Sequence, residues 1–320
     1  MDLGGVFPPI PTPFRGGALD AGALGANCER WMQTGLRGIV VLGSNGEAPL
    51  LDDDESDRVI ATARARVPDG RLLIAGVARE STVGTVRAAT RAAACGADAV
   101  LVRTPWFFKA LQTREALTRH YTAVADASPV PVLLDNFTAL TGVTLPLAAV
   151  ARLARHPNIV GMKESGSDIA FISALIDETP DDFSVLAGSA PVFYASLVSG
   201  AAGGILALAC AVPEPCVQLF DMVAAGRLAE ARILQRRLTP LARLLTRVHG
   251  VPGLKAALDI AGYTGGGARP PLLPGGPGAL IPTHAGPPSP AESRRPRPVR
   301  PAATAGGAPR RYSQRCPAPP

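Results

Sequence analysis

The stretch Ile159-Val160-Gly161-Met162-Lys163-Glu164-Ser165 decides the fold prediction for this chain. It is a short apolar run, typical of a buried β-strand, with one lysine near its end. Seven similar runs occur at residues 6–10, 38–43, 72–77, 99–105, 130–136, 183–188 and 203–208. Segments with Ala, Leu, Arg and Glu at helical spacing separate them. Strands that are apolar throughout favour a parallel sheet covered on both faces. Eight strand–helix units in about 210 residues predict an α/β fold, a (β/α)8 TIM barrel.

The domain organisation follows from the same pattern. We expect the barrel to occupy residues 1–212. Helical patterns at 214–225, 228–249 and 253–261 predict a C-terminal helical extension of the same domain, residues 213–275. Residues 276–320 contain 12 prolines and no apolar period. Such a composition cannot bury enough surface to offset its ordering entropy, so we predict a disordered Pro/Arg-rich tail.

Charge and composition exclude several function classes. The net charge is +6, and the seven arginines and single acid of residues 276–320 account for it. The neutral body therefore predicts no nucleic-acid partner. No apolar run reaches the roughly 18 residues of a membrane span, and no signal peptide is visible, so we expect a cytoplasmic protein. The five cysteines and four histidines are scattered, which predicts no metal site, and we expect no cofactor.

Lys163 is the most informative residue. The chain has three lysines and 29 arginines. Guanidinium stays charged, so arginine cannot replace a lysine that must lose its proton and attack a carbonyl. Burial can lower the pKa of a lysine and make it a nucleophile. A structural lysine with its head extended to solvent is the alternative, and the local sequence leaves both open.

Catalytic residues of a TIM barrel lie at the C-terminal ends of its strands. The second strand ends in Gly43-Ser44-Asn45-Gly46-Glu47, whose backbone and side-chain donors could hold a small carboxylate, although an ordinary turn also explains them. A lysine facing this loop predicts Schiff-base chemistry on a 2-oxo acid, because a protonated imine is an electron sink. The ends of the fourth strand (104–109) and the fifth strand (134–142) are explained on their own as an aromatic cluster and a turn.

With these segments in place, residues 4–275 resemble the dihydrodipicolinate synthase and N-acetylneuraminate lyase superfamily of class I aldolases. Five segments carry the resemblance: Gly-Ser-Asn-Gly-Glu (43–47), His-Pro-Asn-Ile-Val-Gly-Met-Lys-Glu-Ser-Gly (156–166), Val-Leu-Ala-Gly-Ser (185–189), Gly-Gly-Ile-Leu-Ala-Leu-Ala (203–209) and Gly-Val-Pro-Gly-Leu-Lys (250–255). Ser44-Asn45 and residues 156–166 are most similar to 4-hydroxy-2-oxoglutarate aldolases. Dihydrodipicolinate synthases usually have two threonines at 44–45. They also carry, at the position of Leu140, an arginine that binds the second substrate's carboxylate. Leu140 cannot do this, which argues against the lysine-pathway enzyme.

The resemblance implies roles for individual residues. Lys163 would be the Schiff-base nucleophile, with Ser44 as a relay hydroxyl. Gly43, Ser44 and Asn45 would bind the carboxylate of a small 2-oxo acid, and Ile205 would line the wall beside the lysine. The resemblance also implies a homo-oligomer, either a dimer or a tetramer.

Two departures from the family pattern matter for activity. The catalytic tyrosine of the fifth strand aligns with Asp135, and a relay tyrosine contributed across a dimer interface aligns with Phe107. Asp135 could be an alternative acid/base. Alternatively, its charge would hold Lys163 protonated and oppose imine formation. We expect impaired turnover. Trp106, Phe107 and Leu140 predict an apolar distal pocket, with Phe107 in contact with substrate.

The predicted reaction is retro-aldol cleavage of a 4-hydroxy-2-oxo acid, such as 4-hydroxy-2-oxoglutarate, to pyruvate and an aldehyde. A sugar-acid dehydratase or lyase, or a dihydrodipicolinate synthase-like enzyme of the same superfamily, is one alternative. A catalytically dead 2-oxo-acid-binding protein that retains Lys163 is the other.

Overall fold

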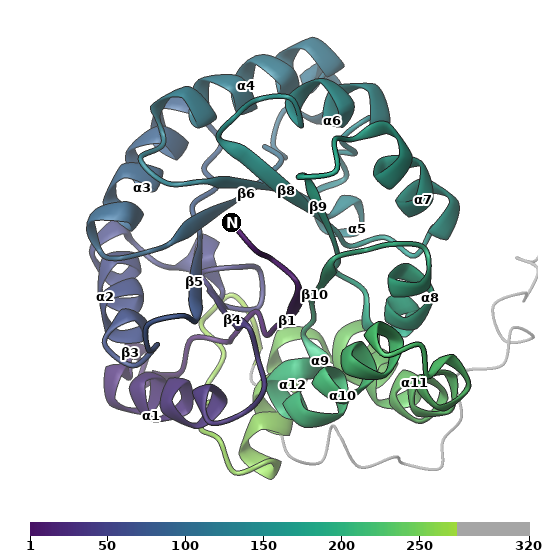
Figure 1. Ribbon diagram of the computed structural model, residues 1–320. Helices are drawn as coiled ribbons and strands as arrows, with labels where there is room; N and C mark the ends of the chain where they lie inside the picture. The colour runs from purple at the N-terminus through teal and green to yellow at the C-terminus, as the bar shows by residue number, and fades with distance from the viewer. Residues whose placement is uncertain (274–320) are drawn as a thin grey trace, which may run out of the picture. The chain divides into compact units, whose positions relative to one another are not determined.

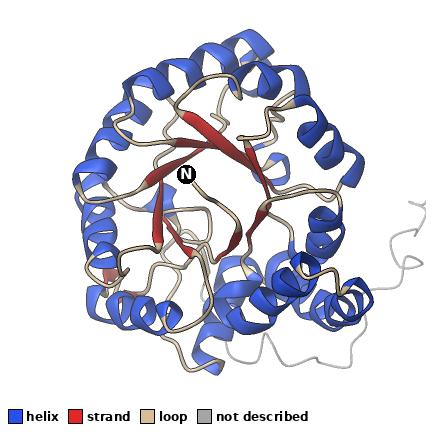
Figure 2. Cartoon of the chain, viewed as in Figure 1, coloured by secondary structure: helices blue, strands red, loops and turns tan. Residues whose placement is uncertain are grey.

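A ring of eight parallel strands surrounded by helices forms the body of the protein (Figure 1; Figure 2). The computed structural model describes residues 1–273; the predicted tail, 276–320, lies outside the described residues. The strands are β1 (Gly5–Phe7), β4 (Gly38–Val41), β5 (Leu72–Gly76), β6 (Ala99–Arg103), β7 (Val132–Asn136), β8 (Ile159–Glu164), β9 (Ser184–Ala187) and β10 (Gly203–Ile205). They pair in the order β1-β10-β9-β8-β7-β6-β5-β4.

Backbone hydrogen bonds close the ring between β1 and β4. The Arg37 N–H donates to Val6 O (3.0 Å), the Val40 N–H donates to Pro8 O (3.0 Å), and the Ile10 N–H donates to Val40 O (2.8 Å). The sheet therefore has no open edge. All eight predicted strand runs contain a strand, and the predicted TIM barrel is confirmed.

The helices follow the strands in sequence and cover the outside of the barrel (Figure 1). They are α1 (Ala21–Met32), α2 (Asp53–Arg64), α3 (Thr82–Ala94), α4 (Arg114–Ala127), α5 (Thr138–Thr141), α6 (Leu147–Leu153), α7 (Ile169–Glu178), α8 (Phe193–Val198), α9 (Leu208–Ala211), α10 (Pro213–Ala224), α11 (Leu228–Arg243) and α12 (Gly250–Ile260). Two features differ from the sequence-based expectation. A short hairpin, β2 (Phe14–Arg15) with β3 (Ala18–Leu19), precedes α1, and α11 passes into a π-helical turn, η4 (Leu244–Val248).

The strands divide the core into two apolar layers. Side chains that point into the barrel include Phe7, Val40, Leu101 and Leu133, and they form one buried cluster. The residues between them pack outward against the helices in a second, larger cluster. Because side chains alternate along a strand, the register places Arg103, Asp135 and Lys163 inside the barrel at neighbouring positions. The inner layer is thus apolar at the bottom and charged at the C-terminal end.

Within residues 1–273, no helix combines the length and the apolar character needed to cross a membrane.

Candidate active site

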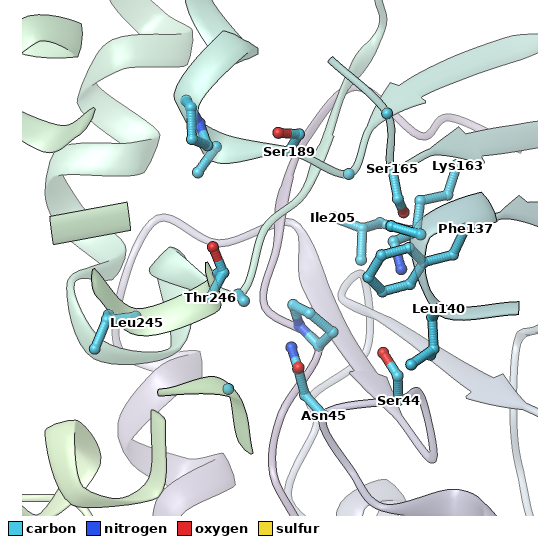
Figure 3. Close-up of a pocket in the computed structure, with 18 of the residues that line it drawn as sticks. Ser44, Asn45, Phe137, Leu140, Lys163, Ser165, Ser189, Ile205, Leu245 and Thr246 are labelled. Atoms are coloured by element: carbon cyan, nitrogen blue, oxygen red, sulfur yellow. The ribbon is translucent and has the colours of Figure 1, made fainter. Parts of the chain in front are cut away.

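A cavity of about 440 Å³ opens at the C-terminal end of the barrel (Figure 3). Its wall comes from strand ends, from the loops after them and from the C-terminal helices. The lining residues are Pro9, Ser44, Asn45, Phe137, Ala139, Leu140, Lys163, Ser165, Gly166, Ser167, Gly188, Ser189, Ala190, Pro191, Ile205, Ala207, Leu245, Thr246, Gly250 and Leu254. In the part of the chain that the structure describes, the cavity included, no group of three or more His, Cys, Asp or Glu residues is arranged to hold a metal ion.

Lys163 brings an amine into this cavity from the penultimate position of β8. Its side chain is only 7% exposed, so the amine lies in a desolvated setting. The nearest charged atom is Asp135 Oδ1, 3.4 Å from Lys163 Nζ, on the neighbouring strand β7. The Phe137 ring lies 5.6 Å from the amine. A largely buried lysine with one carboxylate partner, open to a cavity, can both attack a carbonyl and exchange a proton.

Ser44 and Asn45 project toward the same cavity from the turn after β4 (Figure 3). Two non-glycine residues with left-handed backbone flank this turn, Leu42 (φ 56°) and Glu47 (φ 57°). Such conformations are costly and persist where the surroundings enforce them. Gly76 makes room on the neighbouring strand, since a Cβ there would lie 2.0 Å from Leu42 O. The turn is therefore a rigid platform for the two side chains.

Glu47 anchors the end of this turn to the C-terminal part of the chain. Its carboxylate is fully buried and forms a 2.5 Å ion pair with Lys255 Nζ from α12. The other oxygen accepts from the Arg269 backbone N–H (2.8 Å), and Lys255 Nζ also donates to Gly267 O (2.6 Å). Burial lowers the pKa of Lys255, and the bond to Glu47 opposes part of that shift. The sequence motifs contain both residues, but only the structure pairs them.

The outward-facing neighbours of Asp135 and Lys163 fix the ends of their strands. Asn136 Nδ2 donates to Glu164 Oε2 (2.6 Å), and Glu164 Oε1 accepts from the Gly166 N–H (2.6 Å). Burial raises the pKa of Glu164, whereas these hydrogen bonds oppose the shift. The pair holds β7 and β8 in register just where Asp135 and Lys163 face each other.

Hydroxyl groups also line the cavity: Ser165 lies next to Lys163, and Ser189 and Thr246 lie across from it (Figure 3), with Ser167 in the same lining. The Ser165 Oγ is buried and has no hydrogen-bond partner among the described residues. The apolar distal pocket stays a prediction, since apolar side chains such as Phe137, Ile205 and Leu254 line the cavity beside these hydroxyls. Of the three residues on which it rested, only Leu140 lines the cavity, whereas Trp106 and Phe107 do not. Small polar residues at strand ends carry little signal in a sequence, so these hydroxyls were missed.

The structure brings most of the predicted site residues together. Lys163, Ser44, Asn45 and Ile205 line one cavity. Asp135 does not line it but contacts Lys163 from behind.

Two predicted residues stand apart from the cavity. Gly43 contributes backbone to the turn, where its carbonyl accepts from the Gly46 N–H (3.1 Å). The Phe107 side chain is 74% exposed and does not line the cavity.

Comparison with known proteins gives a consistent result. Residues 2–276 match the model of the dihydrodipicolinate synthetase family. A 4-hydroxy-tetrahydrodipicolinate synthase from Methanoculleus marisnigri is 38% identical, covering 84% of this chain and 92% of the relative. An uncharacterised DapA-like lyase from Halobacterium salinarum is 35% identical, with 85% and 89% covered. The crystal structure of an Acinetobacter baumannii dihydrodipicolinate synthase complexed with pyruvate superimposes with a TM-score of 0.82 at 29% identity, covering 87% and 95% of the two chains. None of these relatives is called a 4-hydroxy-2-oxoglutarate aldolase. The chain belongs to the dihydrodipicolinate synthetase family.

Proposed function

We propose that this protein activates pyruvate as an imine on Lys163 and makes or breaks a carbon–carbon bond between pyruvate and an aldehyde. As a member of its family the chain is a carbon–carbon lyase that acts through an imine with a 2-oxo acid. The residues assigned to the steps, and the aldehyde, are our proposals. The single observation that carries them is the buried Lys163 amine opening into the cavity that Ser44 and Asn45 also line.

The chemistry divides among few groups. Ser44, Asn45 and the backbone N–H groups of their turn would bind the carboxylate of pyruvate through charge-assisted hydrogen bonds. The neutral Lys163 amine would attack the C2 carbonyl, and loss of water would give the imine. The imine withdraws electrons, so a proton leaves C3, and the resulting enamine attacks the aldehyde carbon. Asp135, 3.4 Å from Lys163 Nζ, is the nearest group for proton exchange.

Two aldehyde partners remain in competition. The names of the relatives favour the synthase direction, in which pyruvate condenses with an amino aldehyde acid to form 4-hydroxy-tetrahydrodipicolinate. The resemblance of Ser44-Asn45 and residues 156–166 favours a smaller partner, the aldehyde released from a 4-hydroxy-2-oxo acid such as 4-hydroxy-2-oxoglutarate. Leu140, not an arginine, lies at the wall, and Lys163 is the only cation among the lining side chains that the structure describes. The aldehyde released from 4-hydroxy-2-oxoglutarate also carries a carboxylate, which the hydroxyls of Ser165, Ser189 and Thr246 would bind.

A product assay separates these possibilities. Purified protein is incubated with 4-hydroxy-2-oxoglutarate and release of pyruvate is followed. A parallel reaction contains pyruvate and the four-carbon amino aldehyde acid that the 4-hydroxy-tetrahydrodipicolinate ring requires. We expect pyruvate release to have the higher kcat/KM. Faster condensation would assign the synthase activity. Absence of turnover in both, together with a pyruvate adduct on Lys163, would identify a binding protein.

We also propose that the chain works as a homo-oligomer. Exposed apolar side chains cluster on the loops after β6 and β7, namely Phe107 (74% exposed), Phe108 (63%), Leu111 (69%) and Leu140 (53%). Phe107 and Phe108 pack edge to face with ring centroids 5.0 Å apart. Large exposed apolar patches on a protein surface are typical of interaction sites. Light scattering coupled to size-exclusion chromatography should give at least twice the 32.9 kDa chain mass; a monomer would refute this proposal.

A further inference from the structure

Arg103 is a buried cation beside the catalytic lysine that the steps above do not use. It is the last residue of β6 and is 8% exposed. The register places it opposite Asp135, which in turn lies opposite Lys163, so the three residues occupy one inward-facing row. The Arg103 guanidinium stacks on the Trp106 ring, 4.2 Å from its centroid. The row therefore has a guanidinium (Arg103), a carboxylate (Asp135) and an amine (Lys163) on three adjacent strands.

Hydrogen bonding leaves two members of this row unsatisfied. Within residues 1–273, the buried atoms without a hydrogen-bond partner include both Arg103 Nε and Asp135 Oδ1. A buried charge without a partner is costly, and an opposite charge nearby offsets that cost. Burial lowers the pKa of Arg103, while the negative charge of Asp135, and next that of Glu80, act in the opposite direction. Asp135 thus pairs with Lys163 at 3.4 Å, and Arg103, opposite Asp135 on the neighbouring strand, is a second positive charge beside it.

The other charged or titratable groups around Arg103 are ion-paired, hydrogen-bonded or, like Glu80, exposed to solvent that screens their charge. The Glu80 carboxylate accepts from the backbone N–H groups of Trp106 (3.1 Å) and Phe107 (2.8 Å). Arg79 forms an ion pair with Asp53 (2.8 Å). Tyr121 of α4 donates to Val102 O (3.2 Å), and burial raises its pKa, so it stays neutral at pH 7.

Charge balance in the row consequently depends on Arg103, Asp135 and Lys163. When Lys163 is neutral, the charges of Arg103 and Asp135 cancel. When Lys163 is protonated, the buried row carries an excess positive charge, which is unfavourable in a desolvated site.

We propose that Arg103 is the counter-charge of Asp135 and in this way keeps the Lys163 amine neutral, ready to attack a 2-oxo acid. Arg103 acts through its neighbours and is a positioning residue. Without it, Asp135 would have Lys163 as its only counter-ion, and the ammonium form would be favoured. The Asp135 that replaces the family's tyrosine is then tolerable because Arg103 neutralises it. This role of Arg103 rests on the proposed function, in which Lys163 forms the imine.

The test is the pH dependence of imine trapping. Protein is incubated with pyruvate between pH 5 and pH 10, reduced with borohydride, and the adduct on Lys163 is quantified by mass spectrometry. Arg103→Met should raise the midpoint pH of trapping by about one unit, which is about a 10-fold loss of adduct at a fixed pH below the midpoint. Arg103→Lys keeps the charge and should keep the midpoint. Arg64→Met breaks a distant ion pair with Asp98 (2.9 Å) and should leave the midpoint unchanged.

A double variant separates electrostatics from folding. Arg103→Met combined with Asp135→Asn removes both charges, and its midpoint should fall below that of Arg103→Met alone. Arg103→Met can fail to fold because it leaves Asp135 without its counter-charge. In that case, a double variant that folds and has a midpoint pH at or below the wild-type value supports the proposed role of Arg103. A double variant that does not fold contradicts that role. If the wild type is trapped and Arg103→Met has the same midpoint pH, the role of Arg103 is refuted, whereas the proposed imine on Lys163 still stands. No adduct in the wild type at any pH refutes the proposed function itself.

Discussion

The Glu47–Lys255 ion pair offers a prediction whose size follows from its burial. Glu47 and Lys255 have side chains 0% and 2% exposed, and their charged atoms lie 2.5 Å apart. Replacement of one partner leaves the other charge buried without compensation, which costs about 3–5 kcal/mol. For a domain of this size each kcal/mol lowers Tm by about 2–4 °C, so Glu47→Gln should lower Tm by about 6–20 °C. Lys255→Met should do the same.

The assay is thermal unfolding of the single and double variants with a surface pair as control. Glu47→Gln/Lys255→Met removes both charges, so the double variant should lose less stability than the two single losses combined. The control is Glu115→Gln. Glu115 pairs with Arg119 at 2.9 Å on the surface, with side chains 57% and 80% exposed. Such pairs contribute little, so Tm should hardly change. If Glu47→Gln is as stable as Glu115→Gln, the reasoning is refuted, because the remaining Lys255 charge would then not be buried without compensation.

Three further predictions concern activity and pH. Asp135→Tyr replaces the carboxylate 3.4 Å from Lys163 Nζ by a neutral phenol, which can pass a proton without a buried charge that Arg103 must offset. It should raise kcat/KM by about 10²-fold, whereas lower turnover would show that Asp135 is a working acid/base. Leu140→Arg should raise kcat/KM by about 10-fold for an aldehyde with a carboxylate relative to one without it. An unchanged ratio would show that the aldehyde does not bind near Leu140. Burial lowers the pKa of His120 to about 4, against about 6.5 in an unfolded chain. The unfolded chain therefore binds the extra proton first, and stability should fall by up to about 3 kcal/mol as pH drops from about 6.5 to 4. His120→Phe should flatten that slope in Tm against pH, and an identical slope would contradict it.

The barrel could be predicted because its signal is local and repeated. Each strand is a short apolar run, and five helix starts carry a side-chain cap, from Asp20, Asp52, Ser81, Thr113 and Asp168. Asp52 is an example, since its carboxylate accepts from the Glu55 N–H (2.8 Å) at the start of α2. The short β2–β3 hairpin gave no such signal, because two-residue strands have no periodicity to detect.

Parts of the site could likewise be predicted from local sequence, and other parts could not. Lys163 stands out because a lysine is unusual in a buried strand. Ser44 and Asn45 are ordinary turn residues, and they became informative only beside Lys163 and through the family resemblance. The pairing of Glu47 with Lys255 spans 208 residues in sequence and depends on where α12 packs, which no local pattern encodes. Arg103 was overlooked for a related reason. An arginine that ends an apolar strand normally extends to solvent, and only the barrel register shows that it faces Asp135.

The most direct test of the account is identification of the residue that pyruvate modifies. Wild-type protein and Lys163→Arg are incubated with pyruvate, reduced with borohydride, digested and analysed by mass spectrometry. We expect one adduct on the wild type, on Lys163, and none on Lys163→Arg. An adduct on Lys109 or Lys255, or a wild type without any adduct, would contradict it.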